Sequence, residues 1–246
     1  MINKERVKQI NILILGSAPD AILAREWSSH TFTSIVSINN SWKIRDDWAY
    51  NIFPTDFPLD RRPKPNASQK LFSAKDYVPA QNKYGGFVYA GGTMAFTAAY
   101  WTLATLKPKN LFFLGCDMVY SGRKTHFYGT GTADPLRSDV TLRSLEAKSA
   151  RLECFASAQN CAIYNLSQQK ESRLVFRRKA VKDFSKSLIN DPRQFKKKLF
   201  ELAIKQETAL NYFIDDGKYW KHLDQFDTNK IDNLDNLWLE CLNIKT

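Results

Sequence analysis

The chain has 246 residues, 43% of them apolar, and a formal net charge of +11. This composition allows a sizeable core and excludes a largely disordered chain, and the length fits one large domain or one domain with an appendage. The positive charge favours phosphates, nucleic acid or an anionic membrane surface as partners, against the alternative of a basic protein that is merely soluble. No apolar run approaches the roughly 20 residues of a membrane span, and residues 1–10 lack the apolar core of a signal peptide.

Residues 10–15 form an apolar run that is typical of a central parallel strand. The turn Gly16-Ser17-Ala18-Pro19-Asp20 follows at once. Pro19 suits the first turn of a helix reaching about Trp27, and Ser17 is the better of two candidate caps. This opening is typical of phosphate-binding turns in doubly wound folds, although it matches neither GxGxxG nor a P-loop.

Residues 34–38 are a second predicted strand, which ends at Asn39-Asn40. Two side-chain amides at the end of a strand can form hydrogen bonds with the edge of a base or sugar, or they can simply form a turn. Residues 48–53 are a third predicted strand. The proline-rich, basic stretch 56–70 that follows is either a functional lid or a disordered insertion.

The stretch 84–129 contains the features on which the rest of the interpretation depends. Gly91 and Gly92 let backbone N–H groups approach an anion closely, because no Cβ is present. Thr93 is a suitable cap for a helix that reaches about Leu106, and the free N–H groups of its first turn favour phosphate. The alternative is a tight turn without a ligand.

Residues 111–114 predict a strand buried on both faces, and Asp117 follows at its carboxyl end, where open α/β sheets bind ligands. The next loop contains His126 and continues through residues 126–137, which are rich in hydroxyl groups and end at Arg137. A neutral histidine here is a candidate general base.

A helix is predicted at residues 141–158 and a strand at 162–166. Strand-length apolar runs that alternate with helices predict an α/β fold, a Rossmann-like three-layer sandwich with a mainly parallel sheet. The strands are those near Ile12, Val36, Ile52, Leu111 and Ile163. We assign residues 1–172 to this nucleotide-binding domain.

Residues 173–246 are interpreted as a basic helical extension packed on that domain. Between residues 172 and 205 there are eleven basic and three acidic residues. Helices are predicted at 192–210 and 232–242. A basic amphipathic helix can lie on anionic lipid, or it can be a solvated face held by its apolar side. Nucleic acid is not expected, because few aromatic residues interleave the basic run.

The four cysteines, at positions 116, 154, 161 and 241, show no C-x-x-C spacing. We expect them to be reduced and buried, which is typical of a cytoplasmic protein. No further ligands with metal-site spacing are evident beside them, so no metal site is predicted there. The expected location is therefore the cytoplasm, with contact to the inner membrane through residues 173–205 as an option.

Four motifs carry a resemblance that covers residues 10–170: Gly16-Ser17-Ala18-Pro19, Gly91-Gly92-Thr93, Gly115-Cys116-Asp117-Met118-Val119-Tyr120 and the histidine loop. They resemble elements found in the same order in two related groups. One comprises bacterial sialyltransferases of the Campylobacter type. The other is the domain shared by archaeal hydroxymethylpterin pyrophosphokinases and flagellin-modifying motility accessory factors. Bacterial proteins with this same core are more similar still.

The resemblance implies a Rossmann-like nucleotide-binding domain whose ligand lies among residues of these motifs. It implies contacts to the nucleotide or its phosphate from Gly16, Ser17, Asn39 or Asn40, Gly92, Thr93, Asp117, Tyr120 and Tyr128. It also implies a catalytic histidine, for which His126 is the histidine in the matching loop, although Thr130 stands nearer the expected position. The pterin kinases need Mg²⁺ held by acidic residues, and Asp56, Asp117 and Asp134 are the candidates here.

Three functions are consistent with these features. The first is a glycosyltransferase that uses a CMP-activated or similar nucleotide sugar for cell-surface glycan synthesis. In it His126 accepts a proton, and helix N–H groups, tyrosine hydroxyls and Arg137 stabilise the phosphate. The second is a Mg²⁺-dependent diphosphotransferase of the pterin pyrophosphokinase type. The third is a nucleotide-binding protein without catalysis. No firm cofactor is predicted beyond the nucleotide-sugar co-substrate.

Overall fold

The structure, a computed structural model, describes residues 10–120, 124–130, 138–185 and 190–245. Its centre is a seven-stranded sheet in the order β4-β3-β2-β1-β5-β6-β7, and every neighbouring pair is parallel. The strands are β1 (Asn11–Leu15), β2 (Ser34–Ile38), β3 (Tyr50–Ile52), β4 (Lys70–Phe72), β5 (Asn110–Leu114), β6 (Ala162–Asn165) and β7 (Arg177–Arg178). The predicted α/β fold class with a parallel sheet is confirmed.

The central strands β1 and β5 are buried along their whole length, as their continuous apolar sequences predict. The outer strands β4 and β7 were not predicted. They have three and two residues, and strands this short show no recognisable pattern of apolar residues. β7 lies beyond residue 172, so the sheet continues past the boundary that the sequence analysis placed there.

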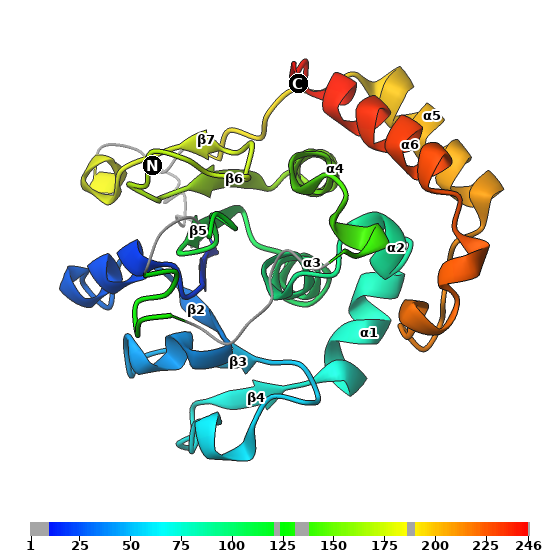
Figure 1. The fold of residues 1–246 in the computed structure, drawn as a ribbon. Helices are drawn as coiled ribbons and strands as arrows, with labels where there is room; N and C mark the ends of the chain where they lie inside the picture. Colours follow the sequence, from blue (N-terminus) through cyan, green and yellow to red (C-terminus); the bar gives the residue numbers. More distant parts are fainter. Residues whose placement is uncertain (1–9, 121–123, 131–137, 186–189, 246) are drawn as a thin grey trace, which may run out of the picture.

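One face of the sheet is covered by α-helices. These are α1 (Ala74–Asn82), α3 (Met94–Leu106) and α4 (Leu145–Ala158), with the short α2 (Phe87–Ala90) beside them (Figure 1). The opposite face is covered by shorter elements, among them the 3₁₀ helix Pro19–Glu26, which the sequence analysis expected as an ordinary helix. Aromatic side chains fill the space on this face: Phe32 and Phe184 pack on Phe112, and Trp48 belongs to the same apolar cluster.

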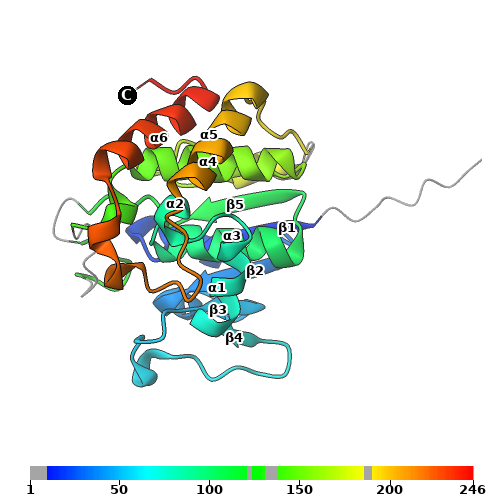
Figure 2. The same cartoon turned by 90° about the vertical axis from the view of Figure 1, so that its right-hand side faces the viewer.

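Two further helices lie outside this sandwich. α5 (Lys197–Leu210) and α6 (Thr228–Cys241) pack on the outer side of α4 and α2, away from the sheet (Figure 2). α5 begins five residues later than predicted. The preceding segment is held by hydrogen bonds instead, because Arg193 donates to the carbonyls of Val175 and Leu242. Asp227 caps α6 by accepting from the N–H groups of Asn229 and Lys230.

The proline-rich stretch that was expected to be a lid or an insertion is held locally by one side chain. Arg62 donates to the carbonyls of Thr55 and Phe57, and its guanidinium lies 4.8 Å from the ring centre of Phe53. Within the described residues, none of the helices has the length and apolar character needed to cross a membrane.

Candidate functional site

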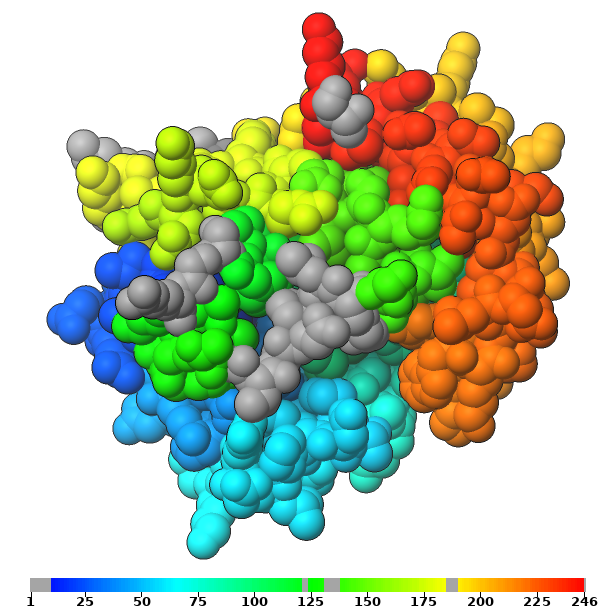
Figure 3. All heavy atoms as spheres, in the orientation of Figure 1, coloured from blue at the N-terminus to red at the C-terminus, as the bar shows by residue number. Residues whose placement is uncertain are grey.

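The carboxyl ends of the strands meet at one edge of the sheet, which faces the viewer in Figure 3. The turn after β1 lies directly against the end of β5: Gly16 N–H donates to the Leu114 carbonyl at 2.8 Å, and Ala18 N–H donates to the Gly115 carbonyl at 3.0 Å. A Cβ on Gly16 would stand 2.2 Å from the Gly115 carbonyl oxygen. Glycine is therefore required at position 16 by the approach of two backbones.

The histidine loop is anchored on this same turn. Phe127 N–H donates to the Ser17 carbonyl at 2.9 Å. His126 and Gly129 exchange two backbone hydrogen bonds, at 2.9 and 3.0 Å, which close the loop into a small hairpin, and Gly129 has the positive φ of 116° that the turn needs. The green atoms of the loop consequently lie beside the blue atoms of the N-terminal part in Figure 3.

His126 is only 6% exposed, and its ring stacks on Tyr128 with the ring centres 5.0 Å apart. Burial lowers the pKa of His126, so the imidazole is neutral at pH 7. Its Nδ1 lies 2.9 Å from the Thr125 hydroxyl oxygen. If Nδ1–H donates to Thr125, Nε2 is free to accept a proton, which is the tautomer that a general base needs.

Two tyrosines accompany the histidine. The ring centre of Tyr120 lies 6.1 Å from that of His126, and burial, followed by the nearby Cys116 and Tyr128, raises the pKa of Tyr120 to about 12. Its phenol is therefore protonated at neutral pH and can donate a hydrogen bond. Tyr128 is 45% exposed, and its ring stands at the surface of the loop. Thr130 is also exposed, while Arg137 lies outside the described residues.

Asp117 follows β5 and is only 2% exposed. Its Oδ1 accepts from Asn165 Nδ2 at 3.2 Å, whereas its buried Oδ2 has no hydrogen-bond partner. The carboxylate lines a cavity of about 260 Å³ at the carboxyl edge, together with Ala18, Pro19, Val119, Lys124, Gln169, Lys170 and Glu171. The strand-end aspartate thus faces a small hollow that two lysines also line.

A second carboxylate, Asp20, follows the β1 turn and is linked to Asp117 through Ser167 and Asn165. Its Oδ2 accepts from the Ser167 hydroxyl at 2.8 Å and from the Gln168 N–H, while its buried Oδ1 has no partner. Burial raises the pKa of Asp20, and the charge of Asp117 adds to this effect. The sequence analysis did not select Asp20, Asn165, Lys124 or Lys170. The available signal was their position, since Asp20 follows the β1 turn and Asn165 ends the strand beside β5.

Asn39 and Asn40 lie at the same edge, after β2. The next residue, Ser41, donates from its hydroxyl to the Leu15 carbonyl at 2.6 Å, which ties this turn to the end of β1. Asn40 is buried, and the Oδ1 atoms of Asn39, Asn40 and Asn51 all lack a hydrogen-bond partner.

The second glycine turn, Gly91-Gly92, was expected to offer backbone N–H groups to a phosphate, but the structure uses these groups for internal hydrogen bonds. Thr93 caps α3 by accepting from Phe96 N–H at 3.3 Å, as its sequence position suggests. However, Gly91 N–H donates to the Phe87 carbonyl, and Gly92 N–H donates to the Thr141 hydroxyl at 3.1 Å. A Cβ on Gly92 would stand 2.5 Å from that hydroxyl oxygen and 2.9 Å from Tyr219 Oη. These two glycines therefore serve internal contacts, and their N–H groups are not free donors for a phosphate.

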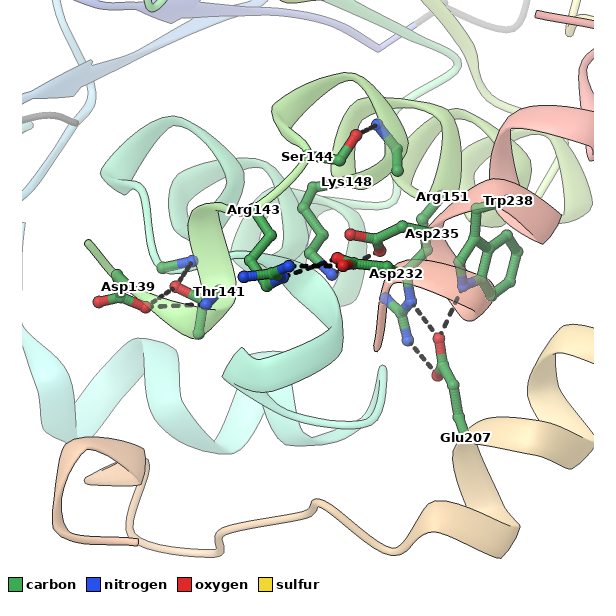
Figure 4. A network of polar contacts seen from close by, with 12 residues as sticks. Asp139, Thr141, Arg143, Ser144, Lys148, Arg151, Glu207, Asp232, Asp235 and Trp238 are labelled. Carbon is green, nitrogen blue, oxygen red and sulfur yellow. Dashed lines mark hydrogen bonds and ion pairs between the residues drawn. The ribbon is translucent and has the colours of Figure 1, made fainter. Parts of the chain in front are cut away.

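The contact at Gly92 belongs to a polar network that reaches the C-terminal helices (Figure 4). Asp139 accepts from the Thr141 hydroxyl at 2.7 Å and from the Tyr219 hydroxyl at 2.8 Å. Further along α4, Lys148 pairs with Asp235 and Arg151 pairs with Glu207, both at 2.7 Å. These contacts hold the loop around Thr141 against Gly92 and Tyr219, and they hold α4 against α6 and α5.

The structure thus brings Gly16, Ser17, Asp117, Tyr120, His126 and Tyr128 into one group by the contacts described, with Asn39 and Asn40 after the neighbouring strand. Gly92 contacts Thr141 instead, and Thr93 caps α3. Of the proposed magnesium ligands, Asp56 is exposed and Asp134 lies outside the described residues. No group of three or more histidine, cysteine, aspartate or glutamate side chains in the described part of the chain could hold a metal ion.

Larger hollows lie elsewhere on the surface. One of about 690 Å³ is lined by residues around Trp42–Trp48 and Pro63–Gln69, and another of about 580 Å³ by Trp27, residues 166–168 and residues 178–183. Neither contains a residue that the motifs single out. We therefore locate the candidate site by its chemistry, at the smaller cavity beside Asp117.

All four cysteines are reduced and buried, as expected from their spacing. Part of the excess positive charge of residues 172–205 is neutralised within the protein, because Arg173, Arg177 and Arg193 pair with Glu146, Asp191 and Glu153.

No protein-family model, curated protein or solved structure matches this chain.

Proposed function

We propose that this protein is a nucleotide-sugar-dependent glycosyltransferase, similar in its chemistry to the sialyltransferases, with its donor bound at the carboxyl edge of the sheet. The anchoring of the His126 loop on the Gly16-Ser17 turn is the observation that carries the proposal. It brings a neutral imidazole and two tyrosines to the strand ends from which Asp117 faces its cavity.

In the proposed reaction, an acceptor hydroxyl attacks the anomeric carbon of the donor sugar. His126 Nε2 accepts the proton of this hydroxyl as the new glycosidic bond forms and the bond to the phosphate breaks. The departing phosphate gains negative charge. Tyr120, Tyr128, Lys124 and Lys170 are the nearby side chains that can donate hydrogen bonds to it.

The donor class follows from the same group of residues. A CMP-activated sugar, used for cell-surface glycan synthesis, is the proposed donor, because CMP can leave without a metal ion. The unpartnered amide oxygens of Asn39, Asn40 and Asn51 can accept from amino or hydroxyl groups of the nucleoside.

The direct test has two stages. A thermal-shift screen of nucleotides and nucleotide sugars first identifies the donor, because a ligand that binds only the folded state raises its melting temperature. Release of nucleoside monophosphate from that donor is then measured for the wild type and for His126→Ala, with nucleotide affinity measured by calorimetry. We expect turnover to fall about 10²- to 10⁴-fold while affinity is retained.

His30→Ala is the matched control, because His30 is exposed and lies outside the site. It should leave turnover unchanged. Unchanged turnover in His126→Ala would remove His126 from the mechanism, and lost affinity with normal turnover at saturation would make it a binding residue. If the screen finds a nucleotide that binds without turning over, the non-catalytic alternative gains support.

The diphosphotransferase alternative has one observation in its favour, the carboxylates Asp20 and Asp117, which are linked through Ser167 and Asn165. A chelator distinguishes the two functions, since diphosphate transfer requires Mg²⁺ and transfer from a CMP-sugar does not.

The proposal also includes an anionic membrane surface as a partner. Lys196, Lys197, Lys198 and Lys205 are exposed on and beside α5, as is Leu202. Sedimentation with anionic vesicles tests this part.

A further inference from the structure

A groove of about 690 Å³ lies on the face of the sheet that is covered by the short elements, because Ile44 and Trp48 line it and belong to the apolar cluster of that face. Three segments far apart along the chain form its walls, from residues 25–29, 42–48 and 63–69. The third segment belongs to the proline-rich, basic stretch, which has no role in the proposed function. The volume is within the range of about 300–1,000 Å³ that is typical of ligand sites.

Hydrogen bonds between the three segments hold the shape of this groove. Arg45 donates to the Trp27 carbonyl at 2.7 Å, which ties the second segment to the first. Gln69 Nε2 donates to the Asp46 carbonyl at 2.7 Å, which ties the third segment to the second. The protein itself therefore pre-forms the groove, as is usual for ligand sites.

The lining of the groove has an excess of positive charge. Arg45 is neutralised by Asp47, because its guanidinium donates two hydrogen bonds to that carboxylate. The other three cations of the lining are exposed, and none of them is in an ion pair within the described part of the chain: Arg25, Lys43 and Lys64. Cations that have no counter-charge in the protein are available to an anionic ligand.

The remaining side chains of the lining favour a sugar as that ligand. Trp42 is half-buried, with Lys43 Nζ 5.5 Å from its ring centre, so an indole and a cation occur side by side. The apolar face of a sugar ring can be buried against an indole. Asp46 and Asn66 supply acceptors for sugar hydroxyls, whereas the charge of Asp46 repels the phosphates of a nucleic acid. A sugar that carries carboxylates fits both the indole and the cations.

We propose that this groove binds an acidic oligosaccharide, whose carboxylates pair with the three unpaired cations and one of whose rings packs on Trp42. The lining begins near the candidate site, since Trp42 follows Ser41, which is bonded to the end of β1. It reaches Gln69, directly before β4 and thus at the amino ends of the strands. A glycan held along the groove would keep its tip concentrated near the carboxyl edge. That this glycan is the acceptor rests on the proposed function, whereas its binding does not.

The experiment measures glycan binding by the intact protein without any nucleotide. Fluorescently labelled oligogalacturonate and oligosialic acid are titrated with the protein, and binding is followed by fluorescence anisotropy. The same two oligomers with their carboxyl groups reduced to alcohols are the uncharged counterparts, and a labelled oligouridylate represents single-stranded nucleic acid. We expect saturable binding of at least one acidic oligomer, and at least about tenfold weaker binding of its reduced form, because the cations lose their partners.

Two double variants with the same change of net charge locate the site. Lys43→Glu/Lys64→Glu reverses two cations of the groove and should weaken binding of the acidic oligomer at least about tenfold. Lys75→Glu/Lys107→Glu is the matched control, because both lysines are exposed and belong to α1 and to the end of α3, on the other face of the sheet. It should bind as the wild type does. All four side chains are exposed, so both variants should keep the melting temperature of the wild type.

Four results would overturn the inference: no saturable binding of either acidic oligomer, equal binding of the reduced forms, equal affinities of the two double variants, or tighter binding of oligouridylate than of the acidic oligomers. The last result would make the groove a nucleic-acid site.

Turnover separates this inference from the proposed function. With the donor from the thermal-shift screen, Lys43→Glu/Lys64→Glu should raise KM about tenfold or more for an oligomeric acceptor and leave KM unchanged for a monosaccharide acceptor. Donor turnover without binding of an acidic oligomer would refute the groove and leave the proposed function intact. Binding of an acidic oligomer without any nucleotide binding would keep the groove and refute the proposed function.

Discussion

The buried charges of this protein fall into two regions with different partners. At the junction of α4 with α5 and α6, Arg151 and Lys148 are 0% and 1% exposed, and each contacts a carboxylate at 2.7 Å. Trp238 adds a further hydrogen bond to Glu207. At the carboxyl edge, the donors to Asp20 and Asp117 among the described residues are all neutral. Removing a partner from the first region leaves an unpaired charge, whereas the second region already has unpaired groups in the folded protein.

The largest effect is expected at the paired junction. Glu207→Gln leaves the Arg151 guanidinium buried without its counter-charge, and loss of one partner of a buried pair lowers the free energy of unfolding by about 3–5 kcal/mol. Urea unfolding measures the change. Asp232→Asn is the control, because the Arg143–Asp232 pair is exposed on both sides and such a pair contributes about 0–1 kcal/mol. Equal effects of the two substitutions would contradict the distinction between buried and exposed pairs.

Glu153 is an intermediate case, since its cation is 3.2 Å away and its other oxygen is unpartnered. Burial raises the pKa of Glu153 from 4.5 to about 7, against the opposing effect of Arg193. Between these two pH values the folded state binds more protons than the unfolded state, so its stability falls as the pH rises, and the loss is complete above pH 7.

The loss amounts to up to about 3 kcal/mol. Glu153→Gln should remove this pH dependence and be the more stable protein at alkaline pH. Unfolding free energies of both proteins are compared on either side of the window. Parallel pH profiles would show that Glu153 has an ordinary pKa.

Gly92→Ala tests the interpretation that this glycine is needed for internal packing. The added Cβ would stand 2.5 Å from the Thr141 hydroxyl oxygen, and overpacking of this kind lowers stability by about 1–3 kcal/mol. In a Thr141→Ala background the same substitution should have a smaller effect, because the nearest atom is removed. An equal effect in both backgrounds would contradict the contact as its cause.

The smallest effect on stability is expected at the unpaired site. Asp117→Asn should change the free energy of unfolding by less than about 1 kcal/mol, because the replaced Oδ2 makes no hydrogen bond or ion pair with the described residues that could be lost. A loss comparable with that of Glu207→Gln would place Asp117 among the structural charges instead.

The sequence predicts the fold well where the signal is local. Strand-length, mostly apolar runs indicated the five inner strands, and Thr93 was recognised as a cap from its position before a helix. The ends of parallel strands share an edge, so the placement of Gly16, Asn39 and Asp117 there also follows from order along the chain. The outer strand β7 has the sequence Arg177-Arg178 and joins the sheet without any apolar pattern.

The features that the sequence could not provide depend on residues far apart along the chain. Asp20 meets Ser167, 147 residues later, and Gly92 meets Thr141, 49 residues later. A glycine pair before a helix has the same local sequence whether its N–H groups face a phosphate or a hydroxyl of the protein itself. Only the tertiary structure distinguishes these cases, and for Gly92 it favours the hydroxyl.

The pairing of α4 with the C-terminal helices has a consequence for synthesis on the ribosome. Arg151 precedes Glu207 by 56 residues, and Lys148 precedes Asp235 by 87 residues. While the chain is being made, α4 therefore emerges with two cations whose counter-charges do not yet exist, and strands β6 and β7 of the sheet also come after it in the chain. The nascent domain must keep this face of α4 hydrated, or covered by a chaperone, until Asp235 has been added.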